Sequence, residues 1–340
     1  MVNNIHLRVL DSPTAPRFAR ALHKAMGLPG KVVQAQMRPW KDGEHYYRPV
    51  GPTLRGRTVV LPWTVNLDTE ERPYNVAESI AGLGVAVDAC ARMRVREVII
   101  AMPHLDDPSG EILHDFVDRF GVYGDKVVLM RLDPEKPEKE SGLADAELVA
   151  GGALVSGKVV RTLRRERHPI SAVPQLAEIL KASIHPPKFV IGAREYREKT
   201  VEFARALFGR STANNTVIAF MNFGQTRRGR ALELRRANLP GDECVVFLPR
   251  ATNPAPVRRI GNRLRDWGMH QVHLAVIHPA FLPGSEIVFA RGNPFDSLFT
   301  VQSFEDPDIH GVAKGQFNIA SVLSPAQIFA EAIRKHVSGT

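Results

Sequence analysis

Three side chains that could bind an anion come shortly after an apolar segment near residue 248. They are Arg250, Thr252 and Asn253. We expect them in a turn between a strand, Cys244–Leu248, and a helix, Val257–Trp267, and ligands of open α/β sheets bind at the ends of such strands. A phosphate-binding turn usually offers several backbone N–H groups to its ligand. Three residues of this turn are prolines and carry no N–H group: Pro249, Pro254 and Pro256. The turn therefore offers side-chain donors in place of a backbone cradle.

A second group of candidate anion ligands follows the expected strand Thr216–Met221. They are Arg227, Arg228 and Arg230. Gly224 and Gly229 flank this group and would permit the loop to move. Arginine forks suit phosphate oxygens, so the loop is predicted either to bind an anion or to form a solvated helix start.

Length and composition describe a soluble globular chain. Its 340 residues suffice for two domains, and 44% of them are hydrophobic and 24% charged. The longest apolar runs, such as Val98–Met102, are too short to cross a bilayer, and the first 25 residues show no signal-peptide core. Cys90 and Cys244 lie in apolar segments, which predicts reduced, buried thiols and a cytoplasmic location. Neither Cys nor His occurs at metal-ligand spacing, so no metal site is predicted.

The net charge of +9 and the isoelectric point near 9.8 favour an anionic partner, either a nucleotide, a phosphosugar or a nucleic acid. The alternative is a solvated basic surface, because Lys and Arg occur along the whole chain. The densest basic run is Arg161–Arg167, and no aromatic residues interleave with it. The sequence therefore does not favour nucleic acid as the partner.

Strand-like and helix-like segments alternate, which predicts an α/β fold with mainly parallel sheets. The expected strands are His6–Leu10, Thr58–Leu61, Glu97–Met102, Val127–Leu132, Lys188–Ile191, Thr216–Met221, Cys244–Leu248, His273–Ile277 and Leu298–Val301. The expected helices are Pro16–Met26, Tyr74–Met93, Gly110–Phe120, Val173–Ile184, Glu195–Phe208, Leu232–Ala237, Val257–Trp267 and Ser324–Val337. Asp133–Gly152 is charged and rich in Pro and Gly, typical of an exposed loop or insertion. The two halves are alike, which suggests an internal duplication with a boundary near residues 165–185.

Eight segments carry a resemblance to a known enzyme family through their serial order. They are Trp40–Glu44, Leu54–Arg57, Val87–Arg92, Ala101–His104, Ile170–Leu176, Gly268–Val272, Ile277–Phe281 and Ala330–Arg334. In this order they resemble the ribose-phosphate pyrophosphokinases, also called phosphoribosyl pyrophosphate synthetases. The resemblance implies two tandem type I phosphoribosyltransferase-like domains, each a mainly parallel sheet flanked by helices. It places these domains at residues 1–170 and 171–340, with the final helix in the second.

The resemblance also implies chemistry and assembly. Members of this family transfer pyrophosphate from Mg-ATP to ribose 5-phosphate and form oligomers built from dimers. For this chain it implies Trp40 as the residue that stacks on adenine, with Asp42 and Glu44 as polar contacts. The alternative for this loop is a β-turn in which Gly43 has a positive φ and Trp40 anchors the turn.

The family's phosphate-binding and metal-binding residues differ in the first half of this chain. Leu105–Gly110 contains no arginine where the family has two basic residues. Asp106 and Asp107 could hold Mg²⁺ or cap a helix. Arg131–Asp133 stands where the family has a metal-binding Asp-Leu-His.

Further differences fall in the second half. The loop with the three arginines lacks the family's lysine. Leu248 and Pro249 replace the two acids that hold the ribose hydroxyls in the family, and prolines replace the donor-rich phosphate cradle that follows them.

Three classes of function are consistent with this pattern. The first is a catalytically inactive paralogue that acts as a regulatory or structural subunit, as a homo-oligomer or with an active synthetase. The second is an active diphosphokinase that uses Mg and ATP on ribose 5-phosphate or a related phosphosugar, with Arg227, Arg228, Arg230 and Arg250 in place of the missing groups. The third is an anion- or nucleic-acid-binding protein on the same fold. No membrane partner is expected.

Overall fold

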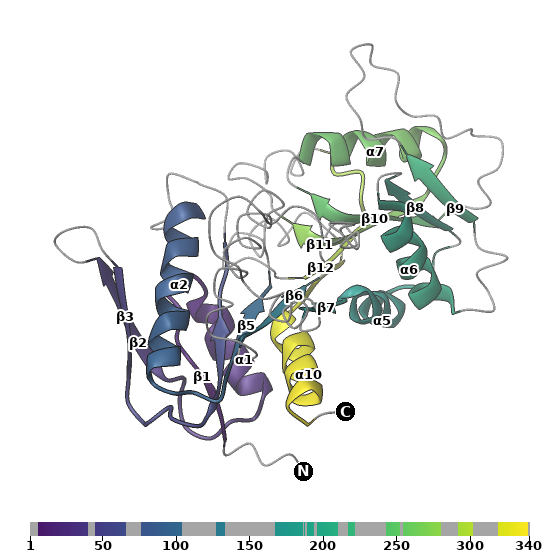
Figure 1. Cartoon of the computed structure of the whole chain (residues 1–340). Helices are drawn as coiled ribbons and strands as arrows, with labels where there is room; N and C mark the ends of the chain where they lie inside the picture. Colours follow the sequence, from purple (N-terminus) through teal and green to yellow (C-terminus); the bar gives the residue numbers. More distant parts are fainter. Residues whose placement is uncertain are drawn as a thin grey trace, which may run out of the picture. The chain divides into compact units, whose positions relative to one another are not determined.

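The structure, a computed structural model, describes residues 6–39, 45–65, 76–103, 127–132, 167–185, 187, 189–193, 196–209, 217–221, 243–251, 254–279, 292–301 and 319–338. The chain divides into two compact units. The first combines Met1–Ile170 with Pro325–Thr340, and the second is Ser171–Ser324. Each unit contains a twisted sheet with helices packed on it (Figure 1).

The first unit is built on a five-stranded sheet in which all neighbouring strands run parallel. Across the sheet the strands are β1 (Leu7–Val9), β4 (Thr58–Pro62), β5 (Glu97–Met102), β6 (Val127–Leu132) and β7 (Arg167–Ile170). Strands buried on both faces form continuous apolar runs, as β4 and β5 do. This accounts for the correct sequence prediction of the first four strands. β7, which reads RHPI, was not predicted because a charged and a Pro residue interrupt its pattern.

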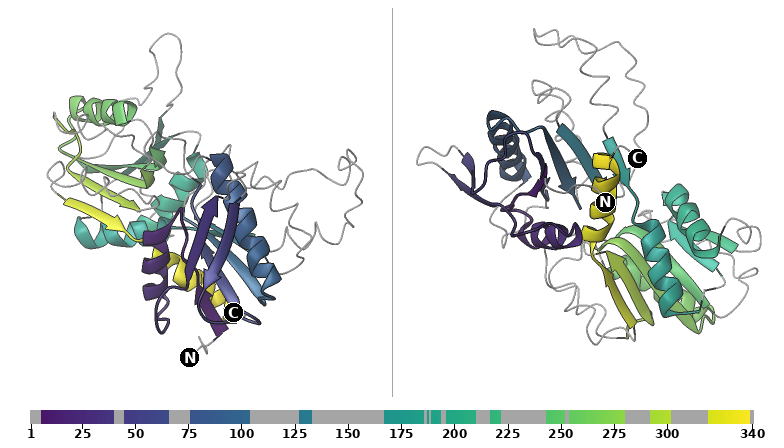
Figure 2. Two further views of the ribbon diagram at one scale, coloured as in Figure 1. Left: turned by 90° about the vertical axis from the view of Figure 1, so that its left-hand side faces the viewer. Right: turned by 90° about the horizontal axis from the view of Figure 1, so that it is seen from below.

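Helices cover both faces of this sheet (Figure 2). α2 (Val76–Arg92) packs on one face over a buried cluster that includes Val59, Leu61 and Cys90. α1 (Pro16–Ala25) and α10 (Pro325–Ser338) pack on the other face. The predicted helices at these positions are confirmed to within about two residues at each end, which is ordinary end fraying.

The final helix belongs to the first unit, although the sequence placed it in the second domain. The rings of Phe18 in α1 and Phe329 in α10 meet edge to face, with centroids 5.3 Å apart. Arg334 Nη1 donates to the Ala25 carbonyl at 3.3 Å, and His336 Nε2 lies 2.8 Å from Glu97 Oε1 at the start of β5. α10 is amphipathic, and its apolar stripe is buried against the matching stripe of α1.

An antiparallel hairpin accompanies α2. Its strands are β2 (Gln34–Pro39) and β3 (His45–Val50), paired from Gln34–Val50 to Pro39–His45. Gly82 of α2 faces the hairpin, and a Cβ at that position would lie 2.2 Å from Met37 Cε. The hairpin was not predicted because its strands alternate polar and apolar residues over short lengths, with one face in solvent.

The second unit is built on a six-stranded parallel sheet. Across the sheet the strands are β13 (Ile319–Leu323), β12 (Ser297–Val301), β11 (Gln271–Pro279), β10 (Glu243–Ala251), β8 (Phe189–Ala193) and β9 (Val217–Met221). The predicted strands at β8 to β12 are confirmed, whereas β13 was missed. The prediction of an α/β chain with mainly parallel sheets flanked by helices is therefore correct for both units.

Residue alternation along the strands divides this unit's core between two helix layers. Residues such as Val246 and Leu274 point toward α7 (Pro254–Asp266). Their neighbours point toward α5 (Val173–Ser183) and α6 (Arg197–Phe208), where the rings of Phe203 and Phe247 stack at 4.4 Å. Gly192 permits α6 to approach β8 closely, because a Cβ there would lie 2.1 Å from Thr200 Oγ1.

Several predicted segments lie outside the described residues. They are the helices at 110–120 and 232–237, the insertion at 133–152, and the basic run apart from Arg167. None of the helices in the described part of the chain is long and apolar enough to cross a membrane.

Candidate functional site

The end of β10 differs from the sequence prediction. The strand does not stop at Leu248 but continues to Ala251, where Arg250 pairs with His278 and Ala251 with Pro279 of β11. Pro249 is compatible with this position because the pairing of β10 with β8 ends at Phe247. α7 begins at Pro254, so Pro254 and Pro256, which the sequence analysis placed in the turn, belong to the first turn of the helix.

Three polar residues lie near the carboxyl ends of β10, β11 and β12, on the face of the sheet that packs against α7. Leu248 and Val276 belong to the buried cluster under α7, and Thr300 of β12 stands beside Val276 in the register. Alternation places Arg250 and His278 on the same face, one step nearer the carboxyl ends. We call Arg250, His278 and Thr300 the carboxyl-end cluster.

The carboxyl-end cluster is shielded from solvent. His278 is 3% exposed and Thr300 fully buried, while Arg250 is half-buried. A guanidinium, an imidazole and a hydroxyl can together donate several hydrogen bonds to an anion. In the described residues the cluster contains no carboxylate, so its charge is positive.

The start of α7 strengthens this positive character. Of its first four residues only Ala255 and Val257 carry an N–H group, since the other two are prolines. The first turn holds no acidic residue, and Arg258 and Arg259 follow directly. Cations near the positive end of a helix dipole are unfavourable unless an anion is present. This edge of the second sheet can therefore attract an anion, mainly through side chains.

The carboxyl end of β4 in the first unit is closed by hydroxyl groups. Thr64 Oγ1 donates to the Thr14 carbonyl at 2.6 Å, and Ser79 Oγ donates to the Thr64 carbonyl at 2.9 Å. Trp63 Nε1 lies 3.1 Å from Ser79 Oγ. All of these residues are buried and bonded to one another, so this network stabilises the edge and offers no open donors.

Of the nine site residues that the sequence proposed, the structure describes one, Arg250. The others lie outside the described residues: Trp40, Asp42, Glu44, Arg227, Arg228, Arg230, Thr252 and Asn253. Residues 40–44 join β2 to β3, and residues 222–242 join β9 to β10. Asp106, Asp107 and Asp133 also lie outside. Among the described residues, no group of three or more His, Cys, Asp or Glu side chains could hold a metal ion.

Sequence reasoning missed His278 and Thr300 as site candidates. Each is the last polar residue of its strand and follows a run of apolar residues. A polar residue at the carboxyl end of a buried parallel strand is the available signal, because ligands bind at that edge of an α/β sheet.

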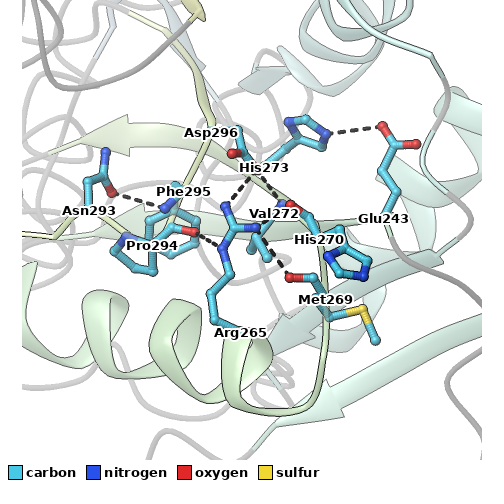
Figure 3. A network of polar contacts seen from close by, with 10 residues as sticks. All are labelled: Glu243, Arg265, Met269, His270, Val272, His273, Asn293, Pro294, Phe295 and Asp296. Carbon is cyan, nitrogen blue, oxygen red and sulfur yellow. Dashed lines mark hydrogen bonds and ion pairs between the residues drawn. The ribbon is translucent and has the colours of Figure 1, made fainter.

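A separate polar network lies at the amino ends of the same strands (Figure 3). Arg265, near the end of α7, donates from Nε to the Pro294 carbonyl at 2.9 Å and from Nη2 to Asp296 Oδ2 at 2.8 Å. Its Nη1 donates to the carbonyls of Met269 and His270. Asp296 Oδ2 also accepts from Val272 N at 2.7 Å. All three nitrogens of the guanidinium are thus engaged, and the network ties α7 to β11 and to the approach to β12.

Two buried titratable groups adjoin this network. Burial lowers the pKa of His273, and the hydrogen bond between its Nε2 and Glu243 Oε1, 3.1 Å long, opposes that shift. Burial raises the pKa of the Cys244 thiol to about 12, and it does the same for Cys90. Both thiols are free and protonated at neutral pH, as the sequence predicted.

Comparison with solved structures identifies the architecture. The crystal structure of phosphoribosylpyrophosphate synthetase from Mycobacterium smegmatis superposes with a TM-score of 0.71, at 14% sequence identity, over 98% of this chain and 100% of that chain. In fold, this chain is similar to a phosphoribosylpyrophosphate synthetase. No protein-family model and no curated protein sequence matches the chain.

The similarity confirms the predicted two-domain phosphoribosyltransferase-like fold. At this level of identity it establishes the fold and not the activity.

The Arg265 network predicts a specific loss of stability. We expect Asp296→Asn to lower the free energy of unfolding by about 1.5–3 kcal/mol, since the substitution removes a charged acceptor shared by Arg265 and Val272. Urea unfolding followed by circular dichroism measures the change. Asp266→Asn removes an exposed carboxylate from the same helix and should change stability by less than about 0.5 kcal/mol. Equal effects of the two substitutions would contradict the role of the network.

Proposed function

We propose that this chain is a phosphoribosylpyrophosphate synthetase-like protein without diphosphokinase activity, acting as a regulatory or structural subunit of an oligomer. The fold supports the first part of the proposal. The end of β10 supports the loss of activity, because this is where the resemblance places the acids that hold ribose.

The single observation that carries the proposal is the environment of Leu248. Its side chain is 4% exposed and belongs to the core cluster under α7. An ionised carboxylate at that position would need a partner or solvent to offset its desolvation, whereas Leu248 packs within a cluster of hydrophobic side chains. Pro249 follows in the strand, and α7 begins with Pro254, Ala255 and Pro256, so the start of this helix offers few N–H groups for a phosphate. The loss of the acids and the scarcity of N–H donors would each weaken the binding and orientation of ribose 5-phosphate.

The carboxyl-end cluster favours a second candidate function. Arg250, His278 and Thr300 could hold an anionic substrate other than ribose 5-phosphate, for example a related phosphosugar. In that case the chain would be a diphosphokinase of altered specificity that requires Mg and ATP. Arg227, Arg228 and Arg230 would then supply charge to the phosphates, as the resemblance suggests for their loop.

The two functions differ in a direct assay. We expect the purified chain to release no AMP from Mg-ATP and ribose 5-phosphate above the rate of a blank without protein, because the acidic pair and the phosphate cradle are both replaced. An authentic synthetase serves as the positive control for the assay. AMP release at ordinary enzyme rates that Arg250→Gln abolishes would refute the first function and support the second.

The proposed adenine site predicts residual nucleotide binding. If ATP or ADP binds, we expect the base to stack on Trp40 beside Asp42 and Glu44, so Trp40→Ala should weaken binding by about tenfold or more, roughly the contribution of one stacked base. Titration calorimetry at two salt concentrations measures it, and binding should weaken with salt because Coulombic contacts contribute. Trp267→Phe, which alters a tryptophan directly after α7, is the control. A folded Trp40→Ala protein with unchanged affinity would exclude this site.

A structural role requires assembly. We expect a symmetric homo-oligomer, or a mixed oligomer when an active synthetase is present, since closed symmetry is the usual result for such chains. Sedimentation velocity at micromolar concentration measures the state of the chain alone and mixed with a synthetase. A monomer under both conditions would rule out the structural role, whatever the AMP assay shows.

A further inference from the structure

The positive charge of the first unit is concentrated near the start of the chain. The first 65 residues contain ten Lys and Arg but three Asp and Glu, a net charge of +7 out of +9 for the whole chain. From residue 12 to residue 41 there is no acidic residue. Within the first unit the basic character therefore belongs to residues 1–65, and the rest of that unit has a net negative charge.

The fold brings two arginine-rich segments together at the amino ends of β4 and β5. One is the turn LRGR before β4, and the other is ARMRVR, which runs from the last turn of α2 to the residue before β5. Gly56 N donates to the Arg94 carbonyl at 2.9 Å, and Arg96 N donates to the Arg57 carbonyl at 2.8 Å. Five arginines therefore share one edge of the sheet, and we call them the arginine edge: Arg55, Arg57, Arg92, Arg94 and Arg96.

The backbone holds the arginine edge in a defined conformation. Arg94 has φ 55° and is the one described residue other than glycine with a positive φ. It ends α2 at the position where glycine is favoured, because a side chain there strains the backbone. Gly56 opposite has φ 69°. The backbone around residues 56 and 94 therefore has a defined turn geometry on both sides of the arginine edge.

Few negative charges among the described residues face these arginines. Asp88 pairs with Arg92 at 2.7 Å, and Glu97 contacts His336 and the hydroxyl of Thr58. Arg55, Arg94 and Arg96 are exposed and form no ion pair with a described residue. Arg57 is half-buried, and its Nη1 lies 3.2 Å from His6 Nδ1.

Positive charge continues from the arginine edge onto two helix ends. α10 ends beside β5, where His336 meets Glu97 next to Arg96, and its exposed Lys335 lies in the same turn. α1 ends at the carbonyl that Arg334 contacts, and its exposed Lys24 precedes that residue. The positive surface therefore covers several elements, more than a single phosphate would occupy.

We propose that the arginine edge binds the phosphate backbone of a nucleic acid duplex. Guanidinium groups suit phosphate oxygens, to which they can donate two parallel hydrogen bonds. The edge contains no aromatic residue on which unpaired bases could stack, so binding is to the backbone and independent of base sequence. Adjacent strands lie about 4.8 Å apart, so arginines at the ends of neighbouring strands are separated from one another. Such an arrangement suits the row of phosphates in a duplex better than one compact ligand. This surface belongs to the first unit, so it is independent of the proposed function of the carboxyl-end cluster.

Fluorescence anisotropy with a labelled DNA duplex of about 20 base pairs, at salt from about 50 to 200 mM, tests this proposal. We expect binding that weakens steeply with salt. The combined variant Arg55→Gln, Arg94→Gly, Arg96→Gln should bind at least about tenfold more weakly, and the slope of log K against log salt should fall by about 2–3. Arg94→Gly suits the backbone at that position, so the variant should keep the thermal midpoint of the parent.

The matched control removes the same charge from the second unit through Arg197→Gln, Arg205→Gln and Arg263→Gln, which alter exposed arginines of α6 and α7. We expect it to retain duplex affinity within about threefold and to retain most of the salt slope. An equal loss in both variants would overturn the proposal, since binding would then follow net charge alone. Absence of duplex binding by the parent would also overturn it. So would binding of polyglutamate or of free ATP at this edge without binding of duplex, which would assign the surface to an acidic protein or to a small anion.

Discussion

Every described pair of neighbouring strands in the two large sheets is parallel, and this constraint organises the molecule. Parallel strands place all their carboxyl ends at one edge and all their amino ends at the other. Within each unit the two edges can therefore specialise. In the second unit the carboxyl edge holds the cluster of Arg250, His278 and Thr300, and the amino edge holds the Arg265 network. In the first unit the amino edge holds the arginines of residues 55–57 and 92–96.

In the second unit, α7 connects the two edges of the sheet, so contacts at the amino edge determine the geometry at the carboxyl edge. The helix runs back from the end of β10, and Arg265 fixes its last turn to the segments that precede β11 and β12. Midway along the helix, Gly261 leaves no space for a side chain, because a Cβ there would lie 2.5 Å from Pro294 Cγ. A helix held at its end and its middle has little freedom at its start. The position of Arg258 beside the carboxyl edge is thus set by contacts that bind no ligand.

The sequence determined the buried parts of the fold more clearly than its edges or its site. Strands such as Glu97–Met102 could be predicted because burial on both faces requires an unbroken apolar run. The β2–β3 hairpin could not be predicted in this way, because one face of it packs against α2 and the other face is exposed to solvent. The packing partner of α10 could not be predicted either, since an apolar stripe shows that a helix is packed but does not identify the element it packs against. At the site, Arg250 was identified by its type, whereas His278 became a candidate only when the register placed it beside Arg250.

The extension of β10 links stability to the proposed loss of activity. Ligand sites at strand ends usually keep polar groups where a core could otherwise continue, and such groups are a local cost in stability. Leu248 instead joins the core, and β10 gains pairings with β11 up to Ala251. If the ancestral residue was an acid, as the resemblance implies, each step of this change increased apolar burial while it removed a ligand for ribose. A chain released from catalysis can accumulate such steps, and a chain required to bind ribose 5-phosphate cannot. The apolar end of β10 is therefore consistent with the proposed loss of activity.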